Sequence, residues 1–197
     1  MNLLILGATG GTGLELVRRS IDRGHLVTAF VRSPERLKPF QDRVELEPVV
    51  KGHDAVLSGF GPRVPISKAD TNLLQRFAAA LSAAMPNAGV RRVVVESVAF
   101  LFEDSIIPPA YLLGRLLFPG IVADASAMER ILRESNLDWT IVRPPQLTDK
   151  PYTGRYRMRE DHLPPFGFKI SRADVADFML KAVETQASTR KIVGVSN

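Results

Sequence analysis

The feature that most constrains the fold is a glycine-rich turn, Gly7–Gly13, with the sequence Gly-Ala-Thr-Gly-Gly-Thr-Gly. A short apolar run at residues 2–6 comes directly before it. Apolar side chains recur at helical spacing after it, until Gly24. This order predicts a buried strand, a tight turn and an amphipathic helix that Gly24 ends.

The spacing of the glycines gives each of them a different expected task. Gly7 permits a tight turn, Gly10 lets the backbone approach a pyrophosphate, and Gly13 lets the helix pack close to the strand. The free N–H groups of the helix N-terminus favour an anion. Gly7, Thr9, Gly10, Gly11, Thr12 and Gly13 are therefore the predicted phosphate-binding residues of a dinucleotide site.

Strand and helix patterns alternate along the rest of the chain. Strand-like runs are predicted at 26–31, 43–46, 54–58, 91–96, 139–142 and 191–195, and helices at 68–85, 123–135 and 173–183. Such alternation is typical of βαβ units. We therefore expect an α/β fold of Rossmann type, with a doubly wound, mainly parallel sheet. Residues 1–197 would form one NAD(P)-binding domain, with residues 144–168 as a small loop-rich lobe over a substrate cleft.

The connection between Leu46 and Asp54 is too short for an ordinary crossover, which needs about a dozen residues or more. Either the crossover is truncated or residues of the natural polypeptide are absent from this sequence. The sequence leaves both explanations open.

The end of the second strand predicts which dinucleotide is bound. An NAD site places a carboxylate there, whereas an NADP site places arginine near the 2′-phosphate. Here Arg32, Ser33 and Arg36 follow the strand, and no carboxylate stands at its end. Two guanidinium groups and a hydroxyl suit a dianionic phosphate, so NADPH is the expected cofactor.

Composition excludes several classes of protein. There is no cysteine, and no two of the 3 histidines have metal-ligand spacing, so no disulfide framework or metal site is expected. The net charge of +5 includes a local excess at Lys150, Arg155, Arg157 and Arg159. No nucleic-acid-reading motif accompanies it, so we expect a solvated face or attraction of an anionic cofactor instead. No signal peptide or membrane span is predicted, and we expect a cytoplasmic monomer or weak homodimer with a small-molecule acceptor.

Five motifs together resemble one family over nearly the whole chain. They are GATGGTG, VRSPERL, SVAFL, DWTIVRPPQLTD and ISRADVADFML. The chain resembles the atypical short-chain dehydrogenase/reductases, and within them biliverdin-IXβ reductase/flavin reductase and the NmrA-like proteins. The resemblance implies an NADPH site and hydride transfer to a flat conjugated acceptor.

Further cofactor-binding residues are implied only by this resemblance. They follow three strand ends: Ser58, Gly59 and Phe60; Ser97 and Val98; and Arg143, Pro144, Pro145 and Gln146. The sequence also differs from the family pattern at three places. The Asp-containing turn after the third strand is missing, and Val98 and Gln146 replace a serine and a histidine of the tetrapyrrole and flavin reductases.

Ser97 and Tyr111 are the candidate catalytic residues. Tyr111 is followed four positions later by Arg115 instead of the lysine of a Tyr-x-x-x-Lys pair, so it is either a general acid or a residue that lines the cleft. Asp124 and Glu129 are expected on a solvated helix face.

The lack of a Tyr–Lys pair favours an acceptor that is reduced by hydride from the cofactor with little acid–base catalysis by side chains. The expected function is NADPH-dependent hydride transfer to a flavin, a quinone or a tetrapyrrole-like ring. The alternative is a non-catalytic, NmrA-like sensor of NAD(P). A nucleotide-sugar epimerase or dehydratase is disfavoured because the Tyr–Lys pair and a larger C-terminal domain are lacking.

Overall fold

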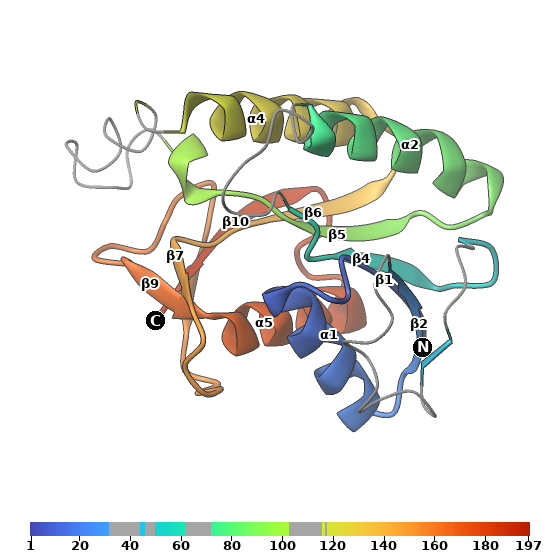
Figure 1. Ribbon diagram of the computed structural model, residues 1–197, viewed down its shortest axis with the longest axis horizontal. Helices are drawn as coiled ribbons and strands as arrows, with labels where there is room; N and C mark the ends of the chain where they lie inside the picture. The colour runs from blue at the N-terminus through green and yellow to red at the C-terminus, as the bar shows by residue number, and fades with distance from the viewer. Residues whose placement is uncertain (32–43, 46–49, 62–71, 103–115, 117) are drawn as a thin grey trace.

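In the computed structural model, residues 1–31, 44–45, 50–61, 72–102, 116 and 118–197 are described. They form a three-layer α/β structure, with one central sheet between two pairs of helices (Figure 1). Arg32, Ser33, Arg36 and Tyr111 lie outside the described residues, so their predicted roles stay predictions.

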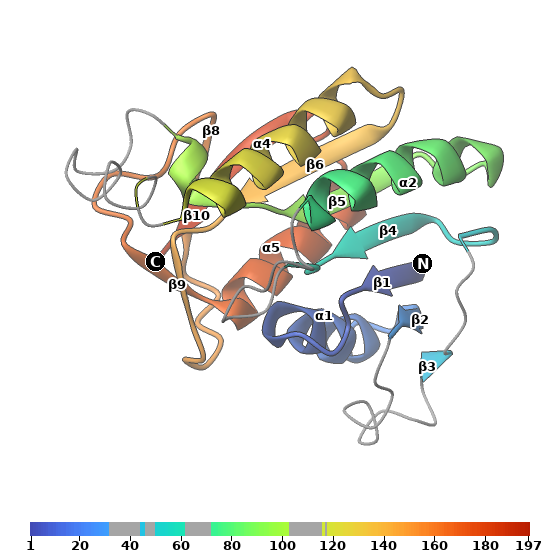
Figure 2. The ribbon, with the colours of Figure 1, turned by 45° about the horizontal axis from the view of Figure 1, so that its top comes forward.

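The central sheet has eight strands in the order β3-β2-β1-β4-β5-β6-β10-β8 (Figure 2). All neighbours pair in parallel except β10 and β8, which are antiparallel. The strands are β1 (Asn2–Leu6), β2 (Leu26–Phe30), β3 (Val44–Glu45), β4 (Ala55–Ser58), β5 (Arg92–Glu96), β6 (Asp138–Arg143), β8 (Arg157–Glu160) and β10 (Lys191–Ser196). The chain order reverses direction between β1 and β4, which is where ligands bind in open α/β sheets. The expected doubly wound, mainly parallel sheet is confirmed.

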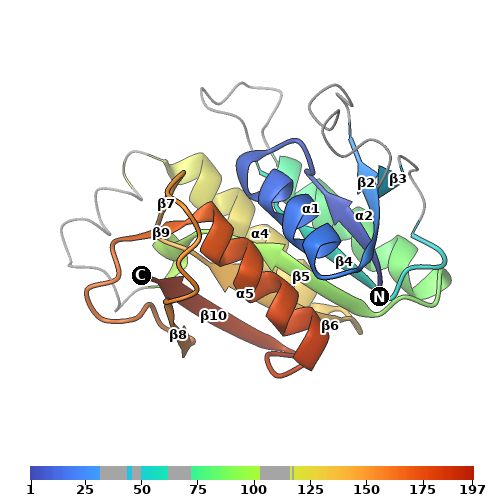
Figure 3. The same cartoon turned by 90° about the horizontal axis from the view of Figure 1, so that it is seen from below.

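Each face of the sheet is covered by two helices. Helices α1 (Gly11–Asp22) and α5 (Arg172–Thr185) lie side by side on one face, as Figure 3 shows from below. Helices α2 (Leu73–Asn87) and α4 (Pro119–Glu134) cover the other. Two apolar clusters result, one around Leu3, Leu16 and Met179 and one around Val56, Leu81 and Met128. Burial on both faces explains why the central strands are nearly continuous apolar runs.

The short connection at residues 46–54 does not join neighbouring strands, because β3 is the edge strand and β4 lies next to β1. Its described end is anchored by His53, whose ring bonds to the Thr28 hydroxyl of β2 at 2.7 Å. Asp54 accepts a hydrogen bond from the Asn2 backbone at 2.7 Å. Strands β2 and β1 therefore lie between the two strands that this connection joins.

The 144–168 segment is more regular than a loop-rich lobe. It contains β7 (Gln146–Thr148), which pairs in parallel with β9 (Lys169–Ser171), and β8, which extends the central sheet. A short 3-10 helix, η3 (Ala99–Leu101), follows β5. In the described part of the chain, every helix is too short or too polar to cross a bilayer. A cytoplasmic location stays a prediction, as do a single domain and a monomeric or weakly dimeric state.

Candidate dinucleotide site

The glycine-rich turn lies at the point where the strand order reverses. Gly7 has a φ of +70°, which favours glycine, and its carbonyl accepts a hydrogen bond from the Gly10 N–H at 2.8 Å. A Cβ at Gly13 would overlap this same carbonyl oxygen. Gly7 and Gly13 therefore make the tight turn possible, as the spacing predicts.

Gly10 faces the turn that follows β4. An ideal Cβ at Gly10 would lie 3.2 Å from the carbonyl oxygen of Gly7 and 3.7 Å from that of Gly59. The Gly59 N–H donates to the carbonyl of Leu6 at 3.2 Å, so the turns after β1 and β4 are held together. Ser58 caps its own turn by accepting from the Phe60 N–H at 3.2 Å. The structure thus brings together the two predicted groups, Gly7–Gly13 and Ser58–Phe60.

The N-terminus of α1 is suited to a phosphate. No side chain caps it, and its first turn contains no acidic residue. Gly11 is exposed there, while Thr9 and Thr12 are buried at 9% and 4% exposure. Free backbone N–H groups and the helix dipole favour an anion at this position. The glycine turn and this helix end fit the pyrophosphate of a dinucleotide.

Arg172, the first residue of α5, lies across this helix end. Its Cδ and Nε would be 2.5 Å from a Cβ at Gly11, so the arginine side chain lies directly beside the exposed glycine. The guanidinium pairs with Asp149 at 2.7 Å, and Asp149 is 89% exposed. An exposed pair of this kind is weak and can exchange for another anion. Sequence reasoning missed Arg172, because only the contact between α1 and α5 places it here.

Glu96 is a second residue that sequence reasoning missed. It ends β5, and its side chain hydrogen-bonds with Thr12 of the glycine-rich turn. Burial raises its pKa to about 7, against the smaller opposing effects of the Thr12 hydrogen bond and the Arg172 charge. Its Oε2 is buried without a hydrogen-bond partner among the described residues. A carboxyl group that titrates near neutrality therefore lies directly beneath the phosphate turn.

Ser97 and Arg143, predicted from different motifs, meet at one carboxylate. Glu129 of α4 accepts from the Ser97 hydroxyl at 2.6 Å and from Arg143 at 2.9 and 2.5 Å. All three are buried, and the Arg143 guanidinium also stacks 4.5 Å from the Phe102 ring centroid. The cluster joins the carboxyl ends of β5 and β6, which the Ala99 N–H also bridges to the Pro144 carbonyl at 3.2 Å.

The expectation that Asp124 and Glu129 are solvated was wrong. They are 8% and 3% exposed. Asp124 accepts from the N–H groups of Leu74 and Gln75 at 2.8 and 2.9 Å, and so caps α2. Both carboxylates face elements that are distant in sequence, which a helical pattern cannot reveal.

The remaining predicted residues lie at the same carboxyl edge. Val98 packs half-buried against the cluster around Met128, and Pro144 is buried. Pro145 is partly exposed, and Gln146 is exposed at the start of β7. These positions are adjacent to the Ser97–Glu129–Arg143 cluster, while their contacts with a cofactor stay predictions.

The ISRADVADFML motif organises the lobe. Asp174 accepts from the Thr153 and Gly154 N–H groups at 3.0 and 2.9 Å and from the Ser171 hydroxyl at 2.8 Å. Asp177 bonds to the Tyr156 hydroxyl at 2.8 Å and pairs with Arg23. Burial opposes ionisation of both carboxyl groups, but hydrogen bonds lower the pKa of Asp174, and hydrogen bonds together with the charges of Lys181 and Arg23 lower the pKa of Asp177. Both acids therefore fix the loop that follows β7 against α5.

Comparison with known proteins agrees with this geometry. A family model described as NAD(P)H-binding matches residues 7–186. An uncharacterized chloroplastic protein of Arabidopsis thaliana is 30% identical over 214 residues, covering 98% of this chain and 75% of that protein. The photosystem II assembly factor Ycf39 of Synechocystis is 25% identical, and the match covers 97% of this chain and 61% of Ycf39.

Three solved structures share the fold over the whole chain. A proposed NAD-dependent epimerase/dehydratase of Bacillus halodurans has a TM-score of 0.84 at 23% identity, with 94% of it covered. A proposed NADH-flavin reductase of Streptococcus pneumoniae has a TM-score of 0.80 at 22% identity, with 99% covered. A short-chain dehydrogenase/reductase of Veillonella parvula, in complex with NADP, has a TM-score of 0.76 at 20% identity, with 94% covered. With the glycine turn and the parallel sheet, the family match shows that this chain belongs to the NAD(P)H-binding family of Rossmann-fold proteins.

Proposed function

We propose that this protein is an NADPH-dependent reductase that transfers hydride to a flat conjugated acceptor, such as a flavin, a quinone or a tetrapyrrole-like ring. The observation that supports the proposal is that the Ser97 hydroxyl donates to the buried carboxylate of Glu129 at 2.6 Å, a contact that joins the end of β5 to α4 and favours a structural task for Ser97. The bound nicotinamide would supply the hydride, and such a transfer needs mainly orientation and water exclusion from the protein. The resemblance to the biliverdin-IXβ reductase/flavin reductase branch supports this acceptor class.

The residues have distinct proposed tasks. Gly10, Gly11 and Thr12 hold the pyrophosphate, and Arg32, Ser33 and Arg36 hold the 2′-phosphate. Ser97, Val98 and the Arg143–Gln146 turn border the nicotinamide, with Tyr111 lining the cleft or acting as a general acid. The buried Glu129–Arg143 pair keeps the ends of β5 and β6 together beneath this cleft.

The test is a steady-state screen of NADPH oxidation with flavins, quinones and a linear tetrapyrrole, together with binding by the Gly10→Ala variant. The wild type should oxidise NADPH with at least one acceptor and gain thermal stability from NADPH by mass action. Gly10→Ala should stay folded but lose the NADPH-induced shift in Tm. A retained shift would show that the phosphate does not bind at Gly10.

Cofactor preference is tested separately at the end of β2. Arg32→Ala should weaken NADPH by about 10- to 100-fold, because charge-assisted hydrogen bonds are lost, and should leave NADH nearly unchanged. Calorimetric titration of both cofactors measures this difference. Equal losses for the two would contradict the assignment of NADPH.

A non-catalytic role is the second candidate. The relative named as a photosystem II assembly factor favours it, since that name describes an assembly role. Tight NADPH binding without oxidation by any acceptor in the screen would support this role over the reductase.

A further inference from the structure

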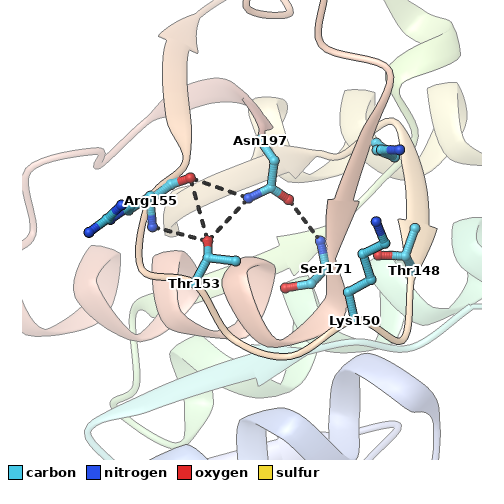
Figure 4. Close-up of a pocket in the computed structure, with 7 residues that line it drawn as sticks. Thr148, Lys150, Thr153, Arg155, Ser171 and Asn197 are labelled. Carbon is cyan, nitrogen blue, oxygen red and sulfur yellow. Dashed lines mark hydrogen bonds between the residues drawn. The ribbon is translucent and has the colours of Figure 1, made fainter.

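A cleft of about 560 Å³ lies beside the dinucleotide site, at the N-terminal end of α5. Figure 4 shows Thr148 and Lys150 beside Ser171, with Asn197 bonded to Thr153 and to the Arg155 backbone. Lys169 also lines the cleft. The charged side chains that line the cleft are all positive, and the other lining residues carry hydroxyl or amide groups.

These cations are available to a ligand. Within the described part of the chain, Lys150, Arg155 and Lys169 form no ion pair with a carboxylate. By contrast, Arg157 of the same basic segment is used structurally, since it donates to the Pro165 carbonyl at 2.7 Å and to the backbone oxygen of Asn197 at 3.0 Å. The buried carboxylate of Asp174 accepts hydrogen bonds from Ser171, Thr153, Gly154 and Asn197.

The strand order places this cleft beyond the nicotinamide end of the dinucleotide site. The predicted 2′-phosphate group follows β2, the phosphate turn follows β1, and Ser97 and Arg143 follow β5 and β6. Asn197 follows β10, the next strand in the sheet. With about 4.8 Å between strands, the ends of β2 and β10 are separated by roughly 24 Å, so the cleft is not the 2′-phosphate site.

A direct contact also joins the two sites. Asp149, between Thr148 and Lys150 in the chain, pairs with Arg172, and the side chain of Arg172 lies beside Gly11. The Asp149–Arg172 pair therefore connects the segment that lines the cleft with the phosphate turn.

We propose that this cleft binds the anionic tail, a phosphate or a carboxylate, of the conjugated acceptor. The inference rests on the proposed reductase function. It narrows the acceptor class to rings that carry an acidic tail. Lys150, Arg155 and Lys169 would supply the positive charge that binds this tail.

The test compares acceptors that differ only in this tail. FMN and riboflavin share a ring but differ in a phosphate, and biliverdin differs from its dimethyl ester in two carboxylates. Binding is measured by fluorescence quenching or calorimetry with NADP⁺ present, so that no turnover occurs. The anionic member of at least one pair should bind about 10- to 100-fold more tightly at low salt. The pair that shows this preference distinguishes a phosphate tail from carboxylates.

The matched variants are the triple substitution Lys150→Gln/Arg155→Gln/Lys169→Gln and the control Arg159→Gln. Arg159 belongs to the same basic segment but does not line the cleft. The triple variant should lose the preference for the anionic member, and the control should keep it. Equal binding of charged and uncharged members by the wild type, or a preference that survives in the triple variant, would overturn the inference.

Turnover separates this inference from the proposed function. Oxidation of NADPH with charged and uncharged acceptors at equal KM would support the proposed reductase function and contradict the tail-binding site. A binding preference that the triple variant loses, without turnover of any acceptor, would support the tail site and overturn the reductase.

Discussion

Glu129 and Arg143 form an ion pair that is buried on both sides, with side chains 4% and 11% exposed. Nε of Arg143 lies 2.9 Å from Oε1 of Glu129, and Nη2 lies 2.5 Å from Oε2. This two-point contact joins α4 to the end of β6, and Ser97 adds the end of β5.

Glu129→Gln should therefore destabilise the protein markedly, because it leaves the buried Arg143 charge without a counter-ion. We expect a loss of about 3–5 kcal/mol in the free energy of unfolding, measured by urea denaturation. The control is Glu160→Gln, which removes an exposed pair with Lys191 at 2.6 Å and should cost less than about 1 kcal/mol. Similar losses for both variants would contradict a structural role for the buried pair.

Glu96 predicts a pH dependence of stability. Its pKa of about 7 in the folded protein exceeds the ordinary value of 4.5, so the native state holds this proton more tightly than the unfolded state. Its contribution is fully present below pH 4.5 and is lost as the pH rises through 7, by on the order of 3 kcal/mol. Glu96→Gln should match the wild type near pH 4.5 and be more stable at pH 8.

The measurement for Glu96 is the difference between the unfolding free energies of Glu96→Gln and wild type across pH 4.5 to 8. Taking the difference removes the contributions of Asp174, Asp177 and Glu184, whose pKa values are lowered and act in the opposite direction. A difference that does not change with pH would show that Glu96 titrates normally.

Substitutions at Arg172 and Asp149 should have opposite effects on dinucleotide affinity. Arg172→Gln should weaken NADPH and NADH equally, by about 10-fold, because the pyrophosphate is common to both. Asp149→Asn should strengthen both slightly, since it frees the guanidinium from its exposed partner. Calorimetric titrations at low and high salt measure both effects. A loss confined to NADPH would place Arg172 at the 2′-phosphate instead.

The hydrogen bonds of Asp174 should hold the loop at residues 149–156 in place. Asp174→Ala removes the acceptor shared by Thr153, Gly154 and Asn197. Hydrogen exchange of this loop should accelerate, while exchange in β1 and β4 should be unchanged. The control Asp138→Ala removes an exposed pair with Arg91 at 3.3 Å and should leave the loop as in wild type. Unchanged exchange in Asp174→Ala would show that the loop is held by other contacts.

The elements with strong local signals could be predicted from the sequence. The turn at Gly7–Gly13 and the buried strands follow from backbone geometry and from burial on both faces, both of which are visible in neighbouring residues. The tasks assigned to Gly7 and Gly13 agree with the positive φ of Gly7 and the overlap at Gly13. The predicted strand and helix positions agree with the structure to within a few residues.

What could not be predicted depends on partners that are distant in sequence. Glu129 resembles a solvated helix residue until β6 brings Arg143 to it, and Arg172 reaches Gly11 only because α1 and α5 pack together. Glu96 resembles the end of an ordinary strand until burial beneath Thr12 raises its pKa. Strand β8 has no alternating pattern, because all four of its residues are exposed.

Strand β8, whose residues are all exposed, forms one edge of the central sheet. β8 pairs with β10 through one side and closes the eight-stranded sheet with Arg157, Arg159 and Glu160 among its residues. A free strand edge is a template on which another chain can add, and closely spaced charges make that addition unfavourable. The charges of this short segment therefore disfavour growth of the sheet through the addition of another chain at β8.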